Sequence, residues 1–181
     1  RDRYRKFIND TNEVQWIQVS DGTDSKFVGY LTHISHSRIR KYAKNKETLL
    51  VVLDQTPFYA ESGGQVGDVG IIKGASGELK VLDVKKDNET HIHFCSGELD
   101  NLEEELECMV DSQHRNSVKN NHTATHLMHK ALKKVLGDHV NQAGSLVHPE
   151  YLRFDLTHFE KISQDEIINI EKIVNQQILL N

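Results

Sequence analysis

Two histidines spaced four residues apart, His122 and His126, are the side chains of this sequence best placed to bind a metal ion together. An α-helix advances about 100° per residue, so the two imidazoles project about 40° apart and their ring nitrogens can converge on one zinc ion. Zinc lowers the pKa of a bound water and polarises a carbonyl group, which are the two requirements of ester hydrolysis. The spacing is therefore compatible with a hydrolytic zinc site.

The same helical face carries a third histidine. His129 lies about 20° to the other side of His122, although its offset of one turn disfavours a compact tetrahedral site. Basic residues also fall on this face: Arg115, Lys119 and Lys133. Spacing alone leaves two interpretations open, a zinc site or a polar helix face that happens to carry histidines. A zinc protease is a poor match, because Thr123 stands where the motif His-Glu-x-x-His needs glutamate.

The helix that would position the pair is expected from Ser112 to Leu136. No turn-forming residue interrupts this stretch before Gly137, and Asp111 or Ser112 can cap its start. After it, the sequence predicts two strands and a final helix that begins at a capping box. The expected positions are Ala143–His148 and Tyr151–Thr157 for the strands, and Ser163 with Glu166 for the capping box. The order helix, strand, strand, helix indicates an α+β unit.

The first half of the chain is rich in short apolar runs separated by turn formers, which predicts strands. They are expected at Lys26–Ile34, Thr48–Asp54, Val69–Lys73, Glu78–Lys85, Thr90–Cys95 and residues 106–110, with a turn at Ser96-Gly97. Strands at this spacing predict a small closed or partly closed barrel. The acidic stretch from Glu98 to Glu107 is interpreted as a solvated sheet edge, and His91 and His93 as surface residues.

Composition excludes several classes of protein. No apolar run approaches the roughly 20 residues of a membrane span. The two cysteines, Cys95 and Cys108, give no disulfide framework and are expected to pack as small apolar groups. A net charge of -5 argues against a protein coated in basic surface, so any RNA contact would use a local patch such as Arg38 to Lys46. These features favour a cytoplasmic protein without a membrane partner.

Four segments resemble, in order and spacing, those of one enzyme family. Residues 121–127, Asn-His-Thr-Ala-Thr-His-Leu, resemble the zinc-ligand helix of alanyl-tRNA synthetase editing domains. Residues 142–145 are similar to the family's Gln-x-Gly-Ser strand, and residues 153–155 to its Arg-Phe-Asp strand. Upstream, residues 54–68 resemble its glycine-rich motif. The resemblance covers nearly the whole chain.

The resemblance implies an α+β fold class, with a small β-barrel followed by a two-layer α+β editing domain. The expected division is a tail of a preceding helical region (residues 1–20), the barrel with the glycine-rich motif (21–111) and the editing domain (112–181). It also implies hydrolysis of Ser or Gly mischarged on alanine tRNA, at zinc held by His122 and His126. The family's remaining Cys and His ligands come from a later segment that does not occur before Asn181. The chain is therefore expected to be a C-terminally cut fragment that binds zinc weakly and is inactive alone.

The resemblance also suggests roles for single residues. Gln142, whose amide both donates and accepts hydrogen bonds, is expected to face the aminoacyl group and to distinguish a serine hydroxyl from an alanine methyl. Thr125 is a second catalytic candidate, although it points to a different helix face. Contacts to substrate or tRNA are expected from Gly63, Gly64, Gln65, Arg153 and Asp155. The glycine-rich stretch is either a tight barrel turn that uses positive φ or a loop that shapes the editing cleft.

Three functions stay open. The first is the zinc-dependent editing region of a ligase, which works with the remainder of the synthetase chain in cis on alanine tRNA. The second is a non-catalytic tRNA-binding barrel module. The third is a freestanding alanyl-tRNA editing protein, which a start at Arg1 without methionine disfavours. No ATP-binding motif occurs, so aminoacylation with ATP would belong to another part of a full-length synthetase.

Overall fold

The computed structural model describes residues 14–45 and 48–180, and these fall into two compact units. The first unit holds the described residues up to Ser62 together with Gly67–Arg115. The second unit holds Gly63–Val66 together with the described residues from Asn116 onwards. The glycine-rich motif is therefore divided between the two units.

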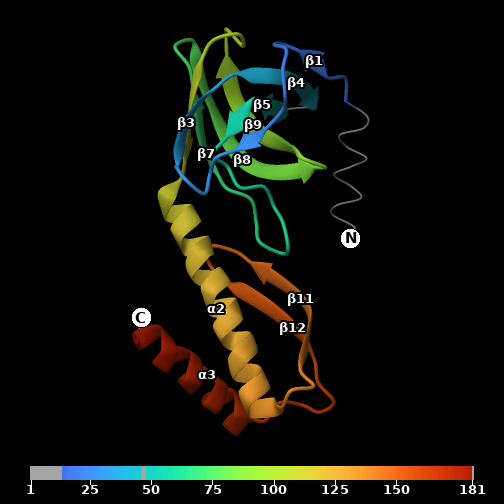
Figure 1. Cartoon of the computed structure of the whole chain (residues 1–181), viewed down its shortest axis with the longest axis vertical. Coiled ribbons are helices and arrows are strands. Elements are labelled where there is room, and N and C mark those ends of the chain that lie inside the picture. Colours follow the sequence, from blue (N-terminus) through green and yellow to red (C-terminus); the bar gives the residue numbers. More distant parts are fainter. Residues whose placement is uncertain (1–13, 46–47, 181) are drawn as a thin grey trace. The chain divides into compact units, whose positions relative to one another are not determined.

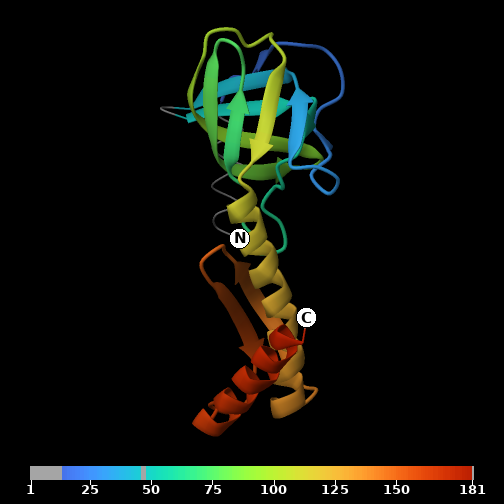
Figure 2. The same cartoon turned by 90° about the vertical axis from the view of Figure 1, so that its left-hand side faces the viewer.

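The first unit is a curled antiparallel sheet of eight strands, which confirms the predicted barrel-like region (Figure 1). The strands follow the order β1-β4-β5-β9-β8-β7-β10-β3 across the sheet, and Figure 2 shows how the sheet curls around its interior. Their bounds are β1 Ile17–Gln18, β3 Ile34–Ser37, β4 Ile39–Asn45, β5 Thr48–Leu53, β7 Gly70–Lys73, β8 Gly77–Asp87, β9 Thr90–Leu99 and β10 Leu106–Val110. Two further short strands, β2 (Lys26–Phe27) and β6 (Gln55–Thr56), pair in parallel.

The start of the chain was expected to be a helical tail over residues 1–20. Residues 1–13 of that range lie outside the described part of the chain. The strand β1 follows at Ile17–Gln18 and pairs with β4. Trp16 packs against a cluster of buried residues on the sheet. The described end of the expected tail thus belongs to the barrel unit.

Alternating burial along the strands builds the core of the barrel unit. In β10, every second residue from Leu106 to Val110 is buried. Successive side chains of a strand point to opposite faces, so this alternation places one face of β10 on the core. The strand β5 differs, because Val51 packs in the main core and Val52 in a second cluster. Both faces of β5 are therefore buried, which explains its unbroken apolar run.

The prediction of one strand from Lys26 to Ile34 is wrong. Instead, β2 and β3 are separated by a turn in which the amide of Leu31 donates to the carbonyl of Val28 at 2.9 Å. Gly29 permits this turn, because an added Cβ would clash with the carbonyl oxygen of Pro57. Leu31 is 92% exposed, so its apolar character did not mark a buried strand.

Two other parts of the sheet differ from expectation. The strand β4 has no counterpart among the predicted strands, because its basic residues suggested a solvated patch. The predicted turn at Ser96-Gly97 lies inside β9. Gly97 marks a close approach of two strands, since an added Cβ would clash with the carbonyl oxygen of Glu78 on β8.

The acidic stretch from Glu98 to Glu107 is not a sheet edge, which corrects the prediction. The strand β10 at its end pairs with β7 on one side and with β3 on the other. Within the stretch, the carboxylate of Glu104 accepts hydrogen bonds from the amides of Ala75 and Ser76, both at 3.1 Å. Glu104 therefore stabilises the turn between β7 and β8.

The second unit combines two helices with a β-hairpin, which confirms the predicted order of elements (Figure 1). The helix α2 spans Ser112–Leu136, as predicted, and its first four residues are counted with the barrel unit. The hairpin strands are β11 (Asn141–Val147) and β12 (Leu152–Thr157), and α3 spans Gln164–Leu179. The two helices and the hairpin share one apolar core, whose buried members are Ala131, Leu132, Val140 and Ile170.

Local signals mark both ends of α2 and the start of α3 where the sequence predicts them. The carboxylate of Asp111 accepts from the amide of His114 at 3.0 Å and caps the start of α2. Gly137 follows its last turn with a φ of 110°. The capping box of Ser163 and Glu166 at the start of α3 is confirmed. No helix in the described ranges is long and apolar enough to cross a membrane.

Candidate functional site

The rings of His122 and His126 meet on an exposed face of α2. Their Nε2 atoms lie 3.0 Å apart. Two nitrogens bound to a tetrahedral zinc ion at about 2.1 Å stand about 3.4 Å from each other, so the pair would have to open by only a few tenths of an ångström. The two residues predicted as ligands are thus close enough, and of the right chemistry, to fit one zinc ion.

Gln65, in the glycine-rich motif, contacts the same pair. Its Oε1 lies 2.7 Å from Nδ1 of His122, across 57 positions of sequence. An amide oxygen only accepts, so the histidine is the donor. The resemblance suggested Gln65 only as a contact to substrate or tRNA. No local pattern in the sequence relates Gln65 to His122, so the contact between them could not be predicted from the sequence.

Backbone pairing with β11 brings Gln65 to this position. Gln65 and Val147 form a parallel β-bridge. The amide of Val66 donates to the carbonyl of Val147 at 3.1 Å, and the amide of Val147 donates to the carbonyl of Gly64 at 2.8 Å. Gln65 and Val66 therefore lie beside β11, joined to it by one isolated bridge. Gly63 and Gly64 form the predicted tight turn with positive φ, but these four residues belong to the second unit, so the turn is not part of the barrel unit.

Glycine is required at position 64, where the chain passes β11, for two reasons. Its φ of 86° lies in the left-handed region that favours glycine. An added Cβ would also lie 2.8 Å from the hydroxyl of Ser145 and would clash with the carbonyl oxygen of that residue. Gly63 has a φ of 58°, but an added Cβ there would meet no atom within 4 Å. Gly63 thus shapes the turn, whereas Gly64 permits the contact with β11.

His129 does not join the other two histidines in a metal-binding group. Its ring packs against Phe154 with ring centroids 5.1 Å apart, and its Nε2 is buried without a hydrogen-bond partner. Across residues 14–45 and 48–180, no three His, Cys, Asp or Glu side chains are grouped so that they could hold a metal ion. Catalytic zinc sites usually have three protein ligands, and the described residues bring two together.

The two catalytic candidates Gln142 and Thr125 lie on different elements of this unit. Gln142 is exposed on β11, and its amide donates to the hydroxyl of Ser145 at 3.1 Å. The register shifts directly after it, between Gln142 and Gly144. The hydroxyl of Thr125 donates to the carbonyl of Asn121 at 2.8 Å. This bond uses the hydroxyl proton, so Thr125 retains only acceptor capacity for a substrate.

Arg153 and Asp155, both candidates for substrate or tRNA contact, pair with each other on β12. Nε of Arg153 lies 3.0 Å from Oδ1 of Asp155, and the side chains are 62% and 45% exposed. Residues two apart on a strand share a face, which explains the pairing. The guanidinium and the carboxylate both remain accessible to a ligand from solvent.

The last part of the glycine-rich motif is held in the barrel unit by a buried ion pair. Nε of Arg115 donates to the two carboxylate oxygens of Asp68 at 2.9 and 3.0 Å. The guanidinium also donates to the carbonyls of Gly29 at 3.0 Å and Pro57 at 2.8 Å. The expectation that Arg115 belongs to an exposed basic face of the helix is therefore wrong. Its partners come from loops that helical periodicity cannot reveal.

Comparison with known proteins assigns the sequence to a family. The family model for tRNA synthetases class II (A) matches residues 5–141. The chain belongs to this family. Among its relatives, the alanine–tRNA ligase of Cytophaga hutchinsonii is 46% identical over 92% of the chain, and that of Christiangramia forsetii is 43% identical over 90%. The alanine–tRNA ligase of Caldicellulosiruptor saccharolyticus is 40% identical over 98% of the chain.

The chain spans about a fifth of the length of these relatives, 19% of the first two and 22% of the third. The predicted relationship to alanyl-tRNA synthetases is confirmed, and the similarity is to one region of those ligases. The described ranges of this synthetase region contain the exposed histidine pair, the Gln65 contact and the two catalytic candidates within a single compact unit.

In the barrel of this synthetase region, the prediction that His91 and His93 are surface residues is wrong. Both are buried, and His93 is completely inaccessible. Nε2 of His93 lies 2.8 Å from the hydroxyl of Thr56, and its Nδ1 lies 2.9 Å from the carbonyl oxygen of Val51. Burial disfavours the charged ring and lowers the pKa of His93 to about 4. His93 therefore uses both nitrogens to stabilise the core.

The basic patch from Arg38 to Lys46 is partly neutralised within the barrel unit. Nη2 of Arg40 lies 3.9 Å from a carboxylate oxygen of Asp54, and Nζ of Lys41 lies 2.8 Å from a carboxylate oxygen of Asp24. Lys46 lies outside the described residues. Cations that are engaged in this way have less free charge for an RNA backbone, which weakens the patch as a tRNA contact.

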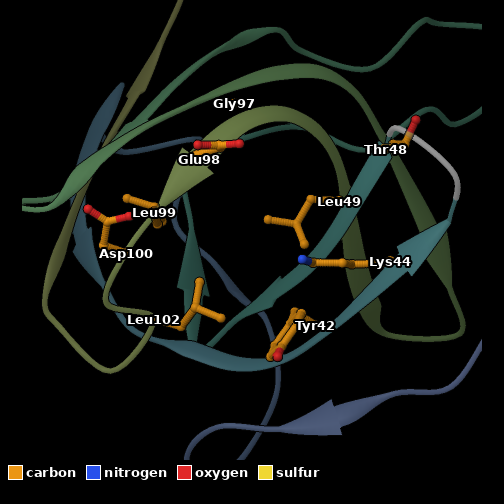
Figure 3. Close-up of a pocket in the computed structure, with 9 residues that line it drawn as sticks. All are labelled: Tyr42, Lys44, Thr48, Leu49, Gly97, Glu98, Leu99, Asp100 and Leu102. Atoms are coloured by element: carbon orange, nitrogen blue, oxygen red, sulfur yellow. The ribbon is translucent and has the colours of Figure 1, made fainter.

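A pocket of about 410 Å³ lies on the barrel unit, next to Lys44 of this patch (Figure 3). Lys44 and Leu49 extend toward its middle from neighbouring strands, and Glu98 and Asp100 also line it. The pocket contains none of the residues predicted for hydrolysis. Its carboxylates would repel a phosphate backbone, so we assign it neither catalysis nor tRNA binding.

Proposed function

We propose that this region edits the product of an alanyl-tRNA synthetase by hydrolysing Ser or Gly that has been esterified to alanine tRNA. The observation that carries the proposal is the pair of Nε2 atoms of His122 and His126, which stand 3.0 Å apart on an exposed helix face. Zinc bound by such a pair would lower the pKa of a water molecule and polarise the ester carbonyl. The similarity to alanine–tRNA ligases supports alanine tRNA as the partner.

The residues of the chain would bind and orient the substrate around this pair. Gln142 would face the aminoacyl group, where its amide can exchange hydrogen bonds with a serine hydroxyl but not with an alanine methyl. Thr125 would accept a hydrogen bond from the substrate, because its hydroxyl already donates to the carbonyl of Asn121. Arg153 and Asp155 would contact the tRNA or the ester, together with the backbone at Gly63 and Gly64.

A complete site would need more than the described residues provide. Two histidines hold zinc less tightly than the three ligands of most catalytic sites. We therefore propose that a further ligand is contributed in cis by another part of the synthetase. The chain alone should then bind zinc weakly and should hydrolyse the ester slowly or not at all.

The test uses the full-length synthetase that carries this region. His122→Ala and His126→Ala are each assayed for hydrolysis of seryl- and glycyl-tRNA for alanine, for charging with alanine, and for tRNA affinity. We expect hydrolysis to fall by more than about 100-fold, because the metal supplies several kcal/mol of transition-state stabilisation. Charging and tRNA affinity should stay unchanged.

His139→Ala is the matched control, because His139 is an exposed histidine of the same unit that contacts His158 rather than the pair. It should leave hydrolysis intact. Unchanged hydrolysis in both His122→Ala and His126→Ala would overturn the proposal. A wild-type enzyme that binds tRNA through this region but hydrolyses neither ester would support the alternative of a non-catalytic tRNA-binding module.

A further inference from the structure

A chain of hydrogen bonds runs from Gln65 through His122 to His126. Oε1 of Gln65 lies 2.7 Å from Nδ1 of His122, and Nε2 of His122 lies 3.0 Å from Nε2 of His126. The amide oxygen can only accept, so Nδ1 of His122 carries a proton. In a neutral imidazole the other nitrogen then holds the lone pair, and Nε2 of His122 accepts from Nε2–H of His126. One acceptor, Gln65, thus sets the direction of both hydrogen bonds.

We propose that Gln65 is a positioning residue that locks His122 in the tautomer protonated at Nδ1 and so directs the lone pair of Nε2 toward His126. In this tautomer Nε2 of His122 can bind a divalent cation without first losing a proton, while His126 shifts its ring proton from Nε2 to Nδ1 as the cation displaces the hydrogen bond between the two rings. In the opposite tautomer a hydrogen atom would occupy the place where the cation has to lie. The segment that carries Gln65 thereby controls which ring nitrogen of His122 is free to bind a metal ion, although Gln65 and His122 are 57 positions apart.

Both partners of this contact are fixed to the same hairpin. The residues flanking Gln65 exchange backbone hydrogen bonds with Val147 at the end of β11. On the helix, Asn121, the neighbour of His122, donates from its side chain to the carbonyls of His148 at 2.7 Å and Pro149 at 3.2 Å. The hairpin therefore holds the acceptor and the ring in register, which distinguishes this contact from a chance meeting of two exposed side chains.

A fixed acceptor has a known effect on metal affinity. A metal-ligating histidine commonly donates its other ring N–H to a carboxylate or carbonyl, and loss of that partner typically costs about 10- to 100-fold in affinity. The expected effect on zinc rests on the proposed function. The tautomer lock itself does not, because it concerns hydrogen bonds that exist without a metal.

The tautomer can be read from the ¹⁵N chemical shifts of the His122 ring in the labelled chain. At about pH 8 we expect the Nδ1–H form in the wild type. Gln65→Glu should keep this form, because a carboxylate also only accepts. Gln65→Leu removes the acceptor and should give a mixture of tautomers. An Nε2–H ring in the wild type, or in Gln65→Glu, would overturn the proposal.

Zinc titration of the same chains gives a second readout. Gln65→Leu should bind Zn²⁺ at least about 10-fold more weakly than the wild type, and Gln65→Glu should bind at least as tightly. Gln176→Leu, at an exposed glutamine of α3, is the matched control and should not change the affinity. Backbone amide spectra of β11 and α2 show whether each variant keeps its fold.

The outcomes separate this inference from the proposed function. Zinc binding with equal affinity in the wild type and Gln65→Leu would overturn the positioning role while the proposed metal site stands. An Nδ1–H tautomer that depends on Gln65, in a chain and a full-length synthetase that bind no zinc, would support the lock and overturn the zinc-dependent function.

Discussion

Arg115 and Asp68 form an ion pair whose side chains are only 9% and 4% exposed. Arg115 lies at the start of α2, and Asp68 lies in the glycine-rich motif. The carboxylate also accepts from the amide of Tyr59 at 2.6 Å, and the guanidinium reaches two carbonyl groups. Both charges are thus paired and hydrogen-bonded within the barrel unit. Removal of either partner would leave the other charge buried and uncompensated.

Replacing Asp68 with alanine should lower the free energy of unfolding of the barrel unit by about 3–5 kcal/mol, because the guanidinium of Arg115 stays buried without its counter-charge. Trp16 is the single tryptophan of the sequence and packs on this unit, so its fluorescence during urea unfolding measures the change. Lys86→Met, which removes the more exposed pair with Glu89 in the same unit, is the control and should change stability little. Equal losses in the two variants would contradict the argument from burial.

His93 should make the stability of the barrel unit depend on pH. Its folded pKa is lowered to about 4, whereas an unfolded histidine titrates near about 6.5. Between these values the unfolded chain binds a proton that the folded chain does not. The free energy of unfolding should therefore fall as the pH is lowered through this window, by about 1.4 kcal/mol per pH unit for this one residue.

His93→Gln tests this dependence, because glutamine can form hydrogen bonds but does not titrate. Urea unfolding is measured between about pH 4.5 and 6.5. As the pH is lowered, the free energy of unfolding should fall more steeply in the wild type than in the variant. The two slopes should differ by up to about 1.4 kcal/mol per pH unit, which corresponds to one proton. The pKa of His91 is also lowered, chiefly by burial, and because His91 is present in both proteins its burial acts on both slopes. Identical slopes would show that His93 is protonated in the folded state as readily as in the unfolded one.

The parts of the fold that were predictable are those whose signals are local. The helix α2 has its cap at Asp111 and its stop at Gly137, and every residue that decides its length lies between or beside them. The capping box of α3 likewise involves two residues three apart, Ser163 and Glu166. Local hydrogen bonds of this kind depend on residue types at fixed spacing, which a sequence displays directly.

The contacts that escaped prediction join residues far apart in the chain. Asp68 and Arg115 are separated by 47 positions, and Gln65 and His122 by 57. The helical pattern marks Arg115 as a basic residue of the helix, but it does not show that Arg115 is buried beside the carboxylate of Asp68. The histidine pair was visible because both members lie on one helix. Zinc binding and the roles of Gln142 and Thr125 stay predictions. They depend on a metal ion, on the aminoacyl substrate and on a further ligand from another part of the synthetase.

Both cysteines of the barrel should be chemically inert in the folded chain. Cys95 and Cys108 are buried in the core, as predicted for small apolar groups. Burial raises the pKa of the Cys108 thiol to about 12 and raises that of Cys95 as well. Alkylation requires the thiolate, so iodoacetamide at neutral pH should label neither residue until guanidinium unfolds the chain. Mass spectrometry counts the adducts, and rapid labelling of the folded chain would contradict the prediction.

Gly64→Ala should disrupt the pairing between residues 63–66 and β11. The backbone at Gly64 has a φ of 86°, and a Cβ there would run into Ser145. The segment must shift, at a cost of more than about 1 kcal/mol, and it should draw Gln65 away from His122. The amide of Val147, which donates to Gly64 at 2.8 Å, reports the change, because its hydrogen exchange should become faster.

Gly63→Ala is the matched control for this experiment. Gly63 also has a positive φ, 58°, but an added Cβ would meet no neighbouring atom. This variant should lose only the backbone preference of glycine, about 1 kcal/mol, and should keep the amide of Val147 protected. Equal protection of Val147 in both variants would mean that the approach of Gly64 to Ser145 does not hold the segment on β11. In that case Gln65 would have to be positioned by its side-chain contact with His122 alone.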